Sequence, residues 1–173
     1  MGEQQLVKRA RKGDDEAFYE LLQTVKSSLY RTAYRYFGNE HDALDAVQEV
    51  TCKAYLKLHN LRKPGHFKPW ILRIMMNYCH DEWRRRKRTL PVEEIFSVTS
   101  YDEDTDRYLI LRDLLLDLDP KMQEIIQLKY FEDWTLSQIA EWKRVPEGTI
   151  KTRLNRALKQ LRFEWEKGEE RHV

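Results

Sequence analysis

Hydrophobic positions recur at intervals of three and four along most of the chain, the spacing that one face of an α-helix requires. In the first half this spacing covers residues 14–37, 40–58 and 68–87, with breaks at Gly38-Asn39 and at a loop rich in proline and glycine. Four more helical stretches follow in the second half: 106–118, 121–133, 135–143 and 145–162. Glycine and proline are scarce, at 6 and 5 of 173 residues, which argues against a β-rich chain full of tight turns. We therefore predict an all-α fold.

The helical pattern is interrupted between the two halves. Residues 89–106 have no sustained period, contain one proline and include a run of acidic side chains. The composition changes there from basic to acidic, which is typical of a domain boundary. We expect two small helical domains, residues 1–88 and 107–173, joined by a flexible linker over residues 89–106.

Local signals mark helix boundaries in the second half. Asp119 suits an N-cap and Pro120 a first helical position, and Thr135 and Gln138 have the spacing of a capping box. After residues 135–143 a short turn leads into a second helix with many cationic side chains. Two short helices joined in this way, the second of them basic, indicate a helix-turn-helix.

The basic helix of this pair has one face to bury and one to present. Its apolar positions fall at helical spacing: Ile150, Leu154, Ala157, Leu158 and Leu161. On a helical wheel four polar residues occupy the side that would enter a major groove: Lys151, Thr152, Asn155 and Arg156. Arg153, Lys159 and Arg162 are better placed for phosphate contacts or packing. A charged face can also be merely solvated, but the turn, the cap and the basic face together favour groove binding.

Five consecutive cations, Arg84 to Arg88, end the helix over residues 68–87. They would interact favourably with the negative end of a helix dipole, but one or two cations suffice for that. Trp70, Tyr78 and Trp83 are interleaved with or precede them. Cations that follow phosphates and aromatic rings that stack on bases suit a nucleic-acid strand, so this helix is a second candidate for binding DNA.

An acidic and amide face lies on the helix over residues 40–58, opposite its apolar stripe of Leu44, Val47, Val50 and Ala54. The polar face consists of Asp42, Asp45, Gln48 and Glu49. Such a face is often only solvated, and the sequence alone leaves that interpretation open.

Catalytic and metal-binding patterns are missing from the sequence. The five histidines are scattered, and neither a phosphate-binding glycine loop, a nucleophile elbow nor a paired Cys/His spacing occurs. We expect no enzymatic activity, no metal and no cofactor. The amino terminus lacks the apolar core of a signal peptide, and no apolar run is long enough for a membrane span, so we expect a cytoplasmic protein.

Three segments together resemble bacterial sigma factors of the extracytoplasmic-function (ECF) group. "DALDAVQEVTCKAY" is similar to the acidic segment of conserved region 2, and "FKPWILRIMMNYCHDEWRRRKR" to the basic helix that follows it. "LSQIAEWKRVPEGTIKTRLNRALKQLR" resembles the helix-turn-helix of region 4. The resemblance covers residues 5–165 in the order typical of the family, with a linker between the two regions.

The resemblance implies a subunit that binds core RNA polymerase and directs stress-responsive transcription from particular promoters. In the family, region 2 docks on the clamp helices of the β′ subunit and region 4 on the β flap. Carried over, the first contact falls to Asp45, Gln48 and Glu49, with Asp42 beside them. An anti-sigma factor that binds the two domains is a further implied partner.

The resemblance also implies contacts to promoter DNA, both duplex and single-stranded. Region 4 would read the −35 element through these residues: Lys151, Thr152, Arg153, Asn155, Arg156 and Lys159. Region 2 would capture unstacked bases of the −10 element with the loop over residues 59–66 and the basic helix after it. The residues implied are Asn60, Arg62, Lys63, Trp70, Arg73, Asn77, Trp83, Arg84, Arg85 and Lys87.

One departure from the family affects the helix-turn-helix. Lys143 and Arg144 stand where the family has a Leu-Gly-like pair, so Arg144 is expected to tolerate the turn geometry that glycine usually adopts. A second function stays open at this point: an autonomous helix-turn-helix regulator whose first half senses a ligand or dimerises. Such a regulator would need neither the acidic face nor the basic, aromatic helix.

Overall fold

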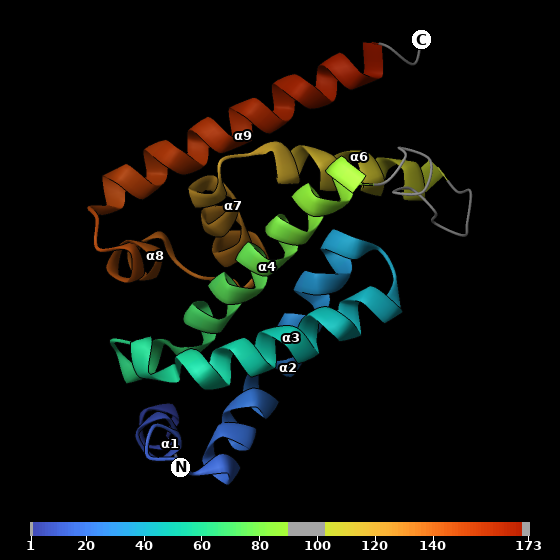
Figure 1. Ribbon diagram of the computed structural model, residues 1–173. Helices are drawn as coiled ribbons and strands as arrows, with labels where there is room; N and C mark the ends of the chain where they lie inside the picture. Colours follow the sequence, from blue (N-terminus) through green and yellow to red (C-terminus); the bar gives the residue numbers. More distant parts are fainter. Residues whose placement is uncertain (1, 90–102, 171–173) are drawn as a thin grey trace. The chain divides into compact units, whose positions relative to one another are not determined.

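The computed structural model describes the backbone of residues 2–89 and 103–170, and these residues form helices and short connections without any strand (Figure 1). The all-α prediction is confirmed over these ranges. The chain divides into two compact units, one within Met1–Ser97 and the other within Val98–Val173. Of the expected linker, Thr89 ends a helix and Glu103–Asp106 begin another, so both of its edges are helical. Residues 90–102 lie outside the described ranges.

Among its described residues, the first unit contains four helices: α1 (Glu3–Ala10), α2 (Asp15–Phe37), α3 (Glu40–Lys57) and α4 (Phe67–Thr89). Helices α2, α3 and α4 pack on one another, and α1 packs on α2. Their core is built from large, fully buried side chains that include Leu21, Leu29, Ile71 and Met75. The sequence pattern predicted α2, α3 and α4 but not α1.

Local signals explain where α2 and α3 begin and end. Asp14 caps α2 by accepting a hydrogen bond from the Ala17 amide at 3.0 Å. Gly38, with φ of 72°, ends α2 in the left-handed conformation that glycine adopts at low cost. Asn39 then caps α3 through the Asp42 amide at 2.9 Å. The break expected at Gly38-Asn39 is confirmed.

The apolar stripe of α3 is shifted from the predicted one. Leu44 is 44% exposed, so its assignment to the buried face was wrong. The buried face consists of small side chains with one valine: Ala43, Ala46, Val50 and Ala54. Alanine allows α3 to approach α2 and α4 closely, and close packing there directs the larger leucine outward.

The connection from α3 to α4 is a structured loop. It contains two short 3₁₀ turns, η1 (Leu58–Asn60) and η2 (Pro64–His66). Leu58 and Leu61 point into the domain and are 4% and 1% exposed. The loop predicted from its proline and glycine content is therefore confirmed, with its polar residues left on the surface.

The second unit contains α6 (Glu103–Asp117), α7 (Pro120–Ile126), α8 (Leu136–Lys143) and α9 (Glu147–Glu170). The helix predicted over residues 121–133 changes at Gln127 into a π-helical segment, η3 (Gln127–Phe131). Helices α6, α7 and α8 each pack on α9. Their shared core holds these buried residues: Leu118, Ile125, Leu128, Ile139, Ile150, Leu154 and Ala157.

The predicted caps in this unit are confirmed. Asp119 accepts a hydrogen bond from the Lys121 amide at 2.9 Å, with Pro120 at the first helical position. Thr135 and Gln138 form a complete capping box at the start of α8. One core assignment was wrong, because Leu158 is 38% exposed. It lies next to the buried Ala157, on the edge of the α9 stripe that faces solvent.

Candidate nucleic-acid interface

Helices α8 and α9 are joined by the tight turn of a helix-turn-helix. Arg144 ends α8 with φ of 57° and ψ of 45°, the left-handed conformation usually taken by glycine at this position. The Val145 amide donates to the Ala140 carbonyl at 3.1 Å and closes the turn. The expectation that Arg144 accommodates the turn geometry is therefore confirmed.

A buried carboxylate holds α8 against α7. Glu124 is 6% exposed. It accepts a hydrogen bond from Trp142 Nε1 at 2.9 Å and forms an ion pair with the Lys143 ammonium group. Trp142 and Lys143 form the last turn of α8, directly before Arg144. Glu124 thus fixes the helix end from which the turn into α9 begins.

The cationic face of α9 is exposed along the half that precedes residue 160. Ile150, Leu154 and Ala157 anchor the opposite face in the domain core. Most of the residues predicted to contact the −35 element are exposed together: Lys151, Thr152, Asn155, Arg156 and Lys159. Arg153 is half-buried at the edge of this face. The Thr152 hydroxyl donates to the Gly148 carbonyl at 2.9 Å, so its oxygen is left to accept from a base or a water.

The basic end of α4 has two kinds of cation. Arg84, Arg85, Lys87 and Arg88 are exposed. Arg86 is held within the domain: it donates to Asp42 at 2.7 Å and to Glu82 at 3.3 Å, and lies 5.1 Å from the centre of the Phe37 ring.

These ion pairs shift the titration of the carboxylates. The hydrogen bond from Arg86 is the main cause that lowers the pKa of Asp42, against the opposing effect of burial. Arg85 does the same for Glu82, whose pKa it lowers by donating at 2.9 Å. Both carboxylates are therefore kept charged. Asp42 joins the start of α3 to the end of α4, and Glu82 bonds to Arg85 and Arg86 within α4.

Trp83 does not occupy the position predicted for it. Its side chain is 6% exposed and continues the buried stripe of α4 formed by Leu72, Met76 and Cys79. Lys87 places its ammonium group 5.2 Å from the centre of the Trp83 ring. Stacking of this ring on a base was therefore a wrong prediction, because packing against the domain takes up its surface.

The other aromatic and polar candidates of region 2 lie at or near the surface. Trp70 is half-buried, with its ring centre 5.9 Å from that of Phe67. Arg73 is half-buried and Asn77 is exposed on the same helix. In the loop between α3 and α4, three predicted contacts are exposed: Asn60, Arg62 and Lys63. This loop leads directly into the start of α4, so its polar residues and Trp70 belong to neighbouring segments.

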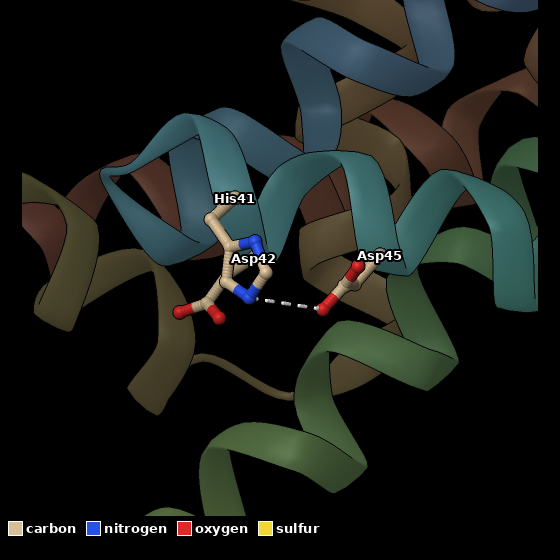
Figure 2. Close-up of side chains that lie close together, drawn as sticks. All are labelled: His41, Asp42 and Asp45. Carbon is tan, nitrogen blue, oxygen red and sulfur yellow. Dashed lines mark ion pairs between the residues drawn. The ribbon is translucent and has the colours of Figure 1, made fainter.

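The acidic face of α3 is exposed at Asp45, Gln48 and Glu49. Asp42 is half-buried and bonded to Asn39 as well as to Arg86. Figure 2 shows His41 and Asp45 on one side of α3, joined by an ion pair at 3.5 Å, with Asp42 beside them. These three side chains lie close enough for a cation, but Asp42 already has its charge compensated by Arg86.

Two structural features that support these surfaces could not be predicted from the sequence. The first is Glu124, whose partners lie 18 and 19 residues further along the chain. The second is α1, an eight-residue helix that contacts α2 and the η2 turn.

Among the described residues, none of the helices has the length and apolar character needed to cross a membrane.

Comparisons with known proteins agree with this division into two units. The model of Sigma-70 region 2 matches residues 21–89, and that of Sigma-70, region 4 matches residues 114–162. An autonomous regulator would not need region 2, so this match decides between the two functions left open by the sequence.

Curated relatives and solved structures cover most of the chain. "RNA polymerase sigma factor SigV" of Bacillus subtilis is 36% identical over 141 residues, spanning 80% of this chain and 85% of the relative. "ECF RNA polymerase sigma factor SigW" of the same organism is 28% identical over 173 residues, spanning 90% of this chain and 92% of the relative. The fold is similar to CnrH in complex with the cytosolic domain of CnrY, with a TM-score of 0.65, 21% identity, and coverage of 95% and 97% of the two chains. The chain therefore belongs to the RNA polymerase sigma factors of the sigma-70 family, in their extracytoplasmic-function group.

Proposed function

We propose that this sigma factor uses three separate surfaces: α9 for the −35 element, the α3–α4 loop with α4 for the −10 element, and α3 for the polymerase. As a sigma factor it binds core RNA polymerase and directs initiation at particular promoters. The observation that supports the assignment best is that most polar side chains predicted for each contact are exposed: on α9 for the −35 element, on the loop and α4 for the −10 element, and on α3 for the polymerase.

The amino-terminal half of α9 enters the major groove at the −35 element. Asn155 and Arg156 present amide and guanidinium groups to base edges, the chemistry that suits adenine and guanine. Lys159 and Arg162, further along the helix, bind phosphates and contribute affinity without sequence preference.

The loop between α3 and α4 receives an extruded base of the −10 element. Extraction of a base costs a few kcal/mol, which the exposed Asn60, Arg62 and Lys63 offset through hydrogen bonds and phosphate contacts. Along α4, a second set of residues follows the strand: Trp70, Arg73, Asn77, Arg84, Arg85 and Lys87. Trp83 supports α4 from within and makes no base contact.

Asp45, Gln48 and Glu49 of α3 bind the β′ clamp helices of core polymerase, and the region 4 unit meets the β flap. Asp42 supports this surface through Arg86 instead of contacting the polymerase. Two small modules bind DNA weakly until the polymerase fixes their spacing, since only then do their affinities combine. The sigma factor itself makes and breaks no bond, and the polymerase catalyses the reaction in the cytoplasm.

An anti-sigma factor is a further proposed partner. Two proteins of similar fold were solved with a partner bound: CnrH with the cytosolic domain of CnrY, and the sigma factor RpoE of Bartonella quintana with the anti-sigma factor NepR. The exposed Leu44 and Tyr34 of the first unit offer apolar surface for such a partner.

Retention of core polymerase by the tagged full-length chain tests the α3 assignment. We expect Asp45→Ala/Glu49→Ala to lose at least tenfold in retained polymerase and in run-off transcription. Glu16→Ala/Glu20→Ala, a control that removes two exposed carboxylates from α2, should behave as the wild type. Equal retention by the α3 variant and the control would contradict the assignment.

A further inference from the structure

We infer that α1 is a clamp that holds the loop between α3 and α4, residues Leu58–Phe67, in the conformation that receives the −10 base. The inference rests on the function proposed for that loop. It assigns a role to a helix that lies outside the matched region 2 segment, which begins at residue 21.

Helix α1 and its C-cap residue Arg11 contact the two ends of the loop. At its beginning, Arg11 Nε donates to the Leu58 carbonyl at 3.3 Å. At its end, Glu3 Oε1 accepts from the Phe67 amide at 3.4 Å. Between these points Gln4 covers Gly65 so closely that a Cβ there would lie 3.2 Å from the Gln4 side-chain nitrogen. One short helix with its C-cap residue therefore spans the loop from its first turn to its last residue.

The clamp is itself fixed to the domain. Leu6, Val7 and Ala10 bury one face of α1, at 5%, 0% and 7% exposure. Arg9 forms an ion pair with Asp14 at 2.7 Å, and Asp14 also caps α2. The Ala17 amide and then Arg9 lower the pKa of Asp14, which keeps this connection charged. A displacement of the loop would therefore have to disturb the contacts of α1 with α2 as well as those of α1 with the loop.

The bonds within the loop each close a single turn. The Leu61 amide donates to the Leu58 carbonyl at 3.1 Å, and the His66 amide to the Lys63 carbonyl at 3.0 Å. Between the two turns lie Arg62 and Lys63, the exposed cations proposed to meet DNA. By fixing the outer ends of both turns, α1 reduces the conformational entropy that the loop loses when a base enters.

Hydrogen exchange in the full-length chain tests the clamp directly. We expect Glu3→Ala/Arg11→Ala to speed exchange of the Leu61, His66 and Phe67 amides about tenfold, while core amides of α2 and α4 keep their protection. Glu3→Gln should exchange like the wild type, because its amide oxygen still accepts from Phe67. Gln5→Ala, at an exposed position of the same helix, is the matched control. Unchanged loop exchange in the double variant would overturn the inference whatever happens to DNA.

Binding of a labelled single-stranded oligonucleotide by the reconstituted holoenzyme supplies the functional measurement. Its sequence is that of the non-template −10 strand of a promoter that the holoenzyme transcribes. We expect the double variant to bind it about three- to tenfold more weakly. The single variant Glu3→Gln should bind it like the wild type, and the double variant should bind a −35 duplex normally.

The same oligonucleotide separates a failure of the clamp from a failure of the loop assignment. If the double variant exchanges faster but binds normally while Arg62→Ala/Lys63→Ala binds weakly, the loop is a DNA site and the clamp role is wrong. If Arg62→Ala/Lys63→Ala also binds normally, the loop is not a DNA site, and both proposals fall.

Discussion

The basic end of α4 and the basic face of α9 are both rich in lysine and arginine, but these side chains differ in the contacts that they make. Along α9, Lys151, Arg156 and Lys159 are exposed on a face opposite the core. At the end of α4, two of five consecutive cations are bonded to carboxylates of the same domain: Arg85 to Glu82, and Arg86 to Glu82 and Asp42. Arg85 keeps 62% of its side chain exposed and can still meet DNA, whereas Arg86 is only 26% exposed and is held by its two carboxylates.

The difference comes from what lies opposite each helix. The buried face of α9 packs on a hydrophobic core that includes residues of α7 and α8. A carboxylate that pairs with a cation of α9 lies on α9 itself, where Glu166 is 3.5 Å from Arg162. The end of α4 lies beside the acidic start of α3, where Asp42 accepts from Arg86. The second unit thus leaves the α9 cations that we propose to meet DNA exposed, and its core packs against the opposite face of the helix. The first unit uses Arg86 to join α4, which we propose binds DNA, to α3, which we propose binds the polymerase.

The largest expected effect comes from removing Glu124, which holds the end of α8 before the turn into α9. Glu124→Ala leaves Lys143 buried without its counter-charge, which should lower the free energy of unfolding of the second unit by about 3–5 kcal/mol. Denaturant unfolding followed by tryptophan fluorescence measures it, and −35 duplex binding should fall with the folded fraction. Glu147→Ala, at an exposed carboxylate of α9, is the control. A loss below about 1 kcal/mol would show that Glu124 does not hold α8.

A second test divides the α9 face into base-reading and phosphate-binding residues. Arg156→Ala should remove about 1–3 kcal/mol of preference at one −35 base pair. Arg162→Ala, one turn and a half further along, should weaken all sequences evenly and reduce the salt slope of binding by about one. Competition binding against a library of −35 duplexes measures both. Equal loss of preference in the two variants contradicts the assignment.

A third test contrasts neighbouring arginines of α4. Arg86→Ala should destabilise the first unit by about 2 kcal/mol, because Asp42 and Glu82 lose a charged donor. Arg84→Ala should change stability by less than about 0.5 kcal/mol and weaken binding of −10 single-stranded DNA. Thermal unfolding and oligonucleotide binding, measured on both variants, give opposite patterns. The same pattern for both would remove the distinction between structural and DNA-binding cations.

The smallest effect is a pH dependence of the same pair. Arg86 lowers the pKa of Asp42 in the folded state. The stabilisation of the folded state by this pair is therefore complete above the ordinary aspartate pKa of about 4. It is lost as the pH falls through the lower folded pKa. Asp42→Asn should therefore flatten the loss of stability between about pH 5 and pH 2, measured by urea unfolding. An unchanged slope would mean that the pair contributes nothing.

The sequence predicted those elements whose signals are local. The apolar period, the caps at Asp119 and Thr135, and the turn at Arg144 each depend on residues within a few positions of one another. They were enough to place α2, α3, α4 and the helix-turn-helix. Helix α1 was missed because eight residues carry only two turns of apolar pattern, and its stability comes from packing on α2.

The errors concern residues whose role depends on distant partners. Trp83 beside a run of cations suggests base stacking, but the register of α4 buries it. Leu44 and Leu158 lie on the edges of their apolar stripes, where helix packing decides which residue faces inward. The partners of Glu124 on α8 could be identified only once α7 and α8 were placed side by side. The apolar period predicts which face of a helix is buried. The packing of the other helices decides which residues at the edge of that face are buried and which are exposed.

Photo-cross-linking in a promoter-bound holoenzyme tests the three-surface account most directly. A photoreactive amino acid replaces Asn155, Arg62 or Gln48 in separate proteins, and each cross-link is mapped. We expect position 155 to label the −35 element, position 62 the non-template −10 strand, and position 48 the β′ clamp helices. Labelling of polymerase alone from positions 155 and 62, or of DNA from position 48, would contradict the account.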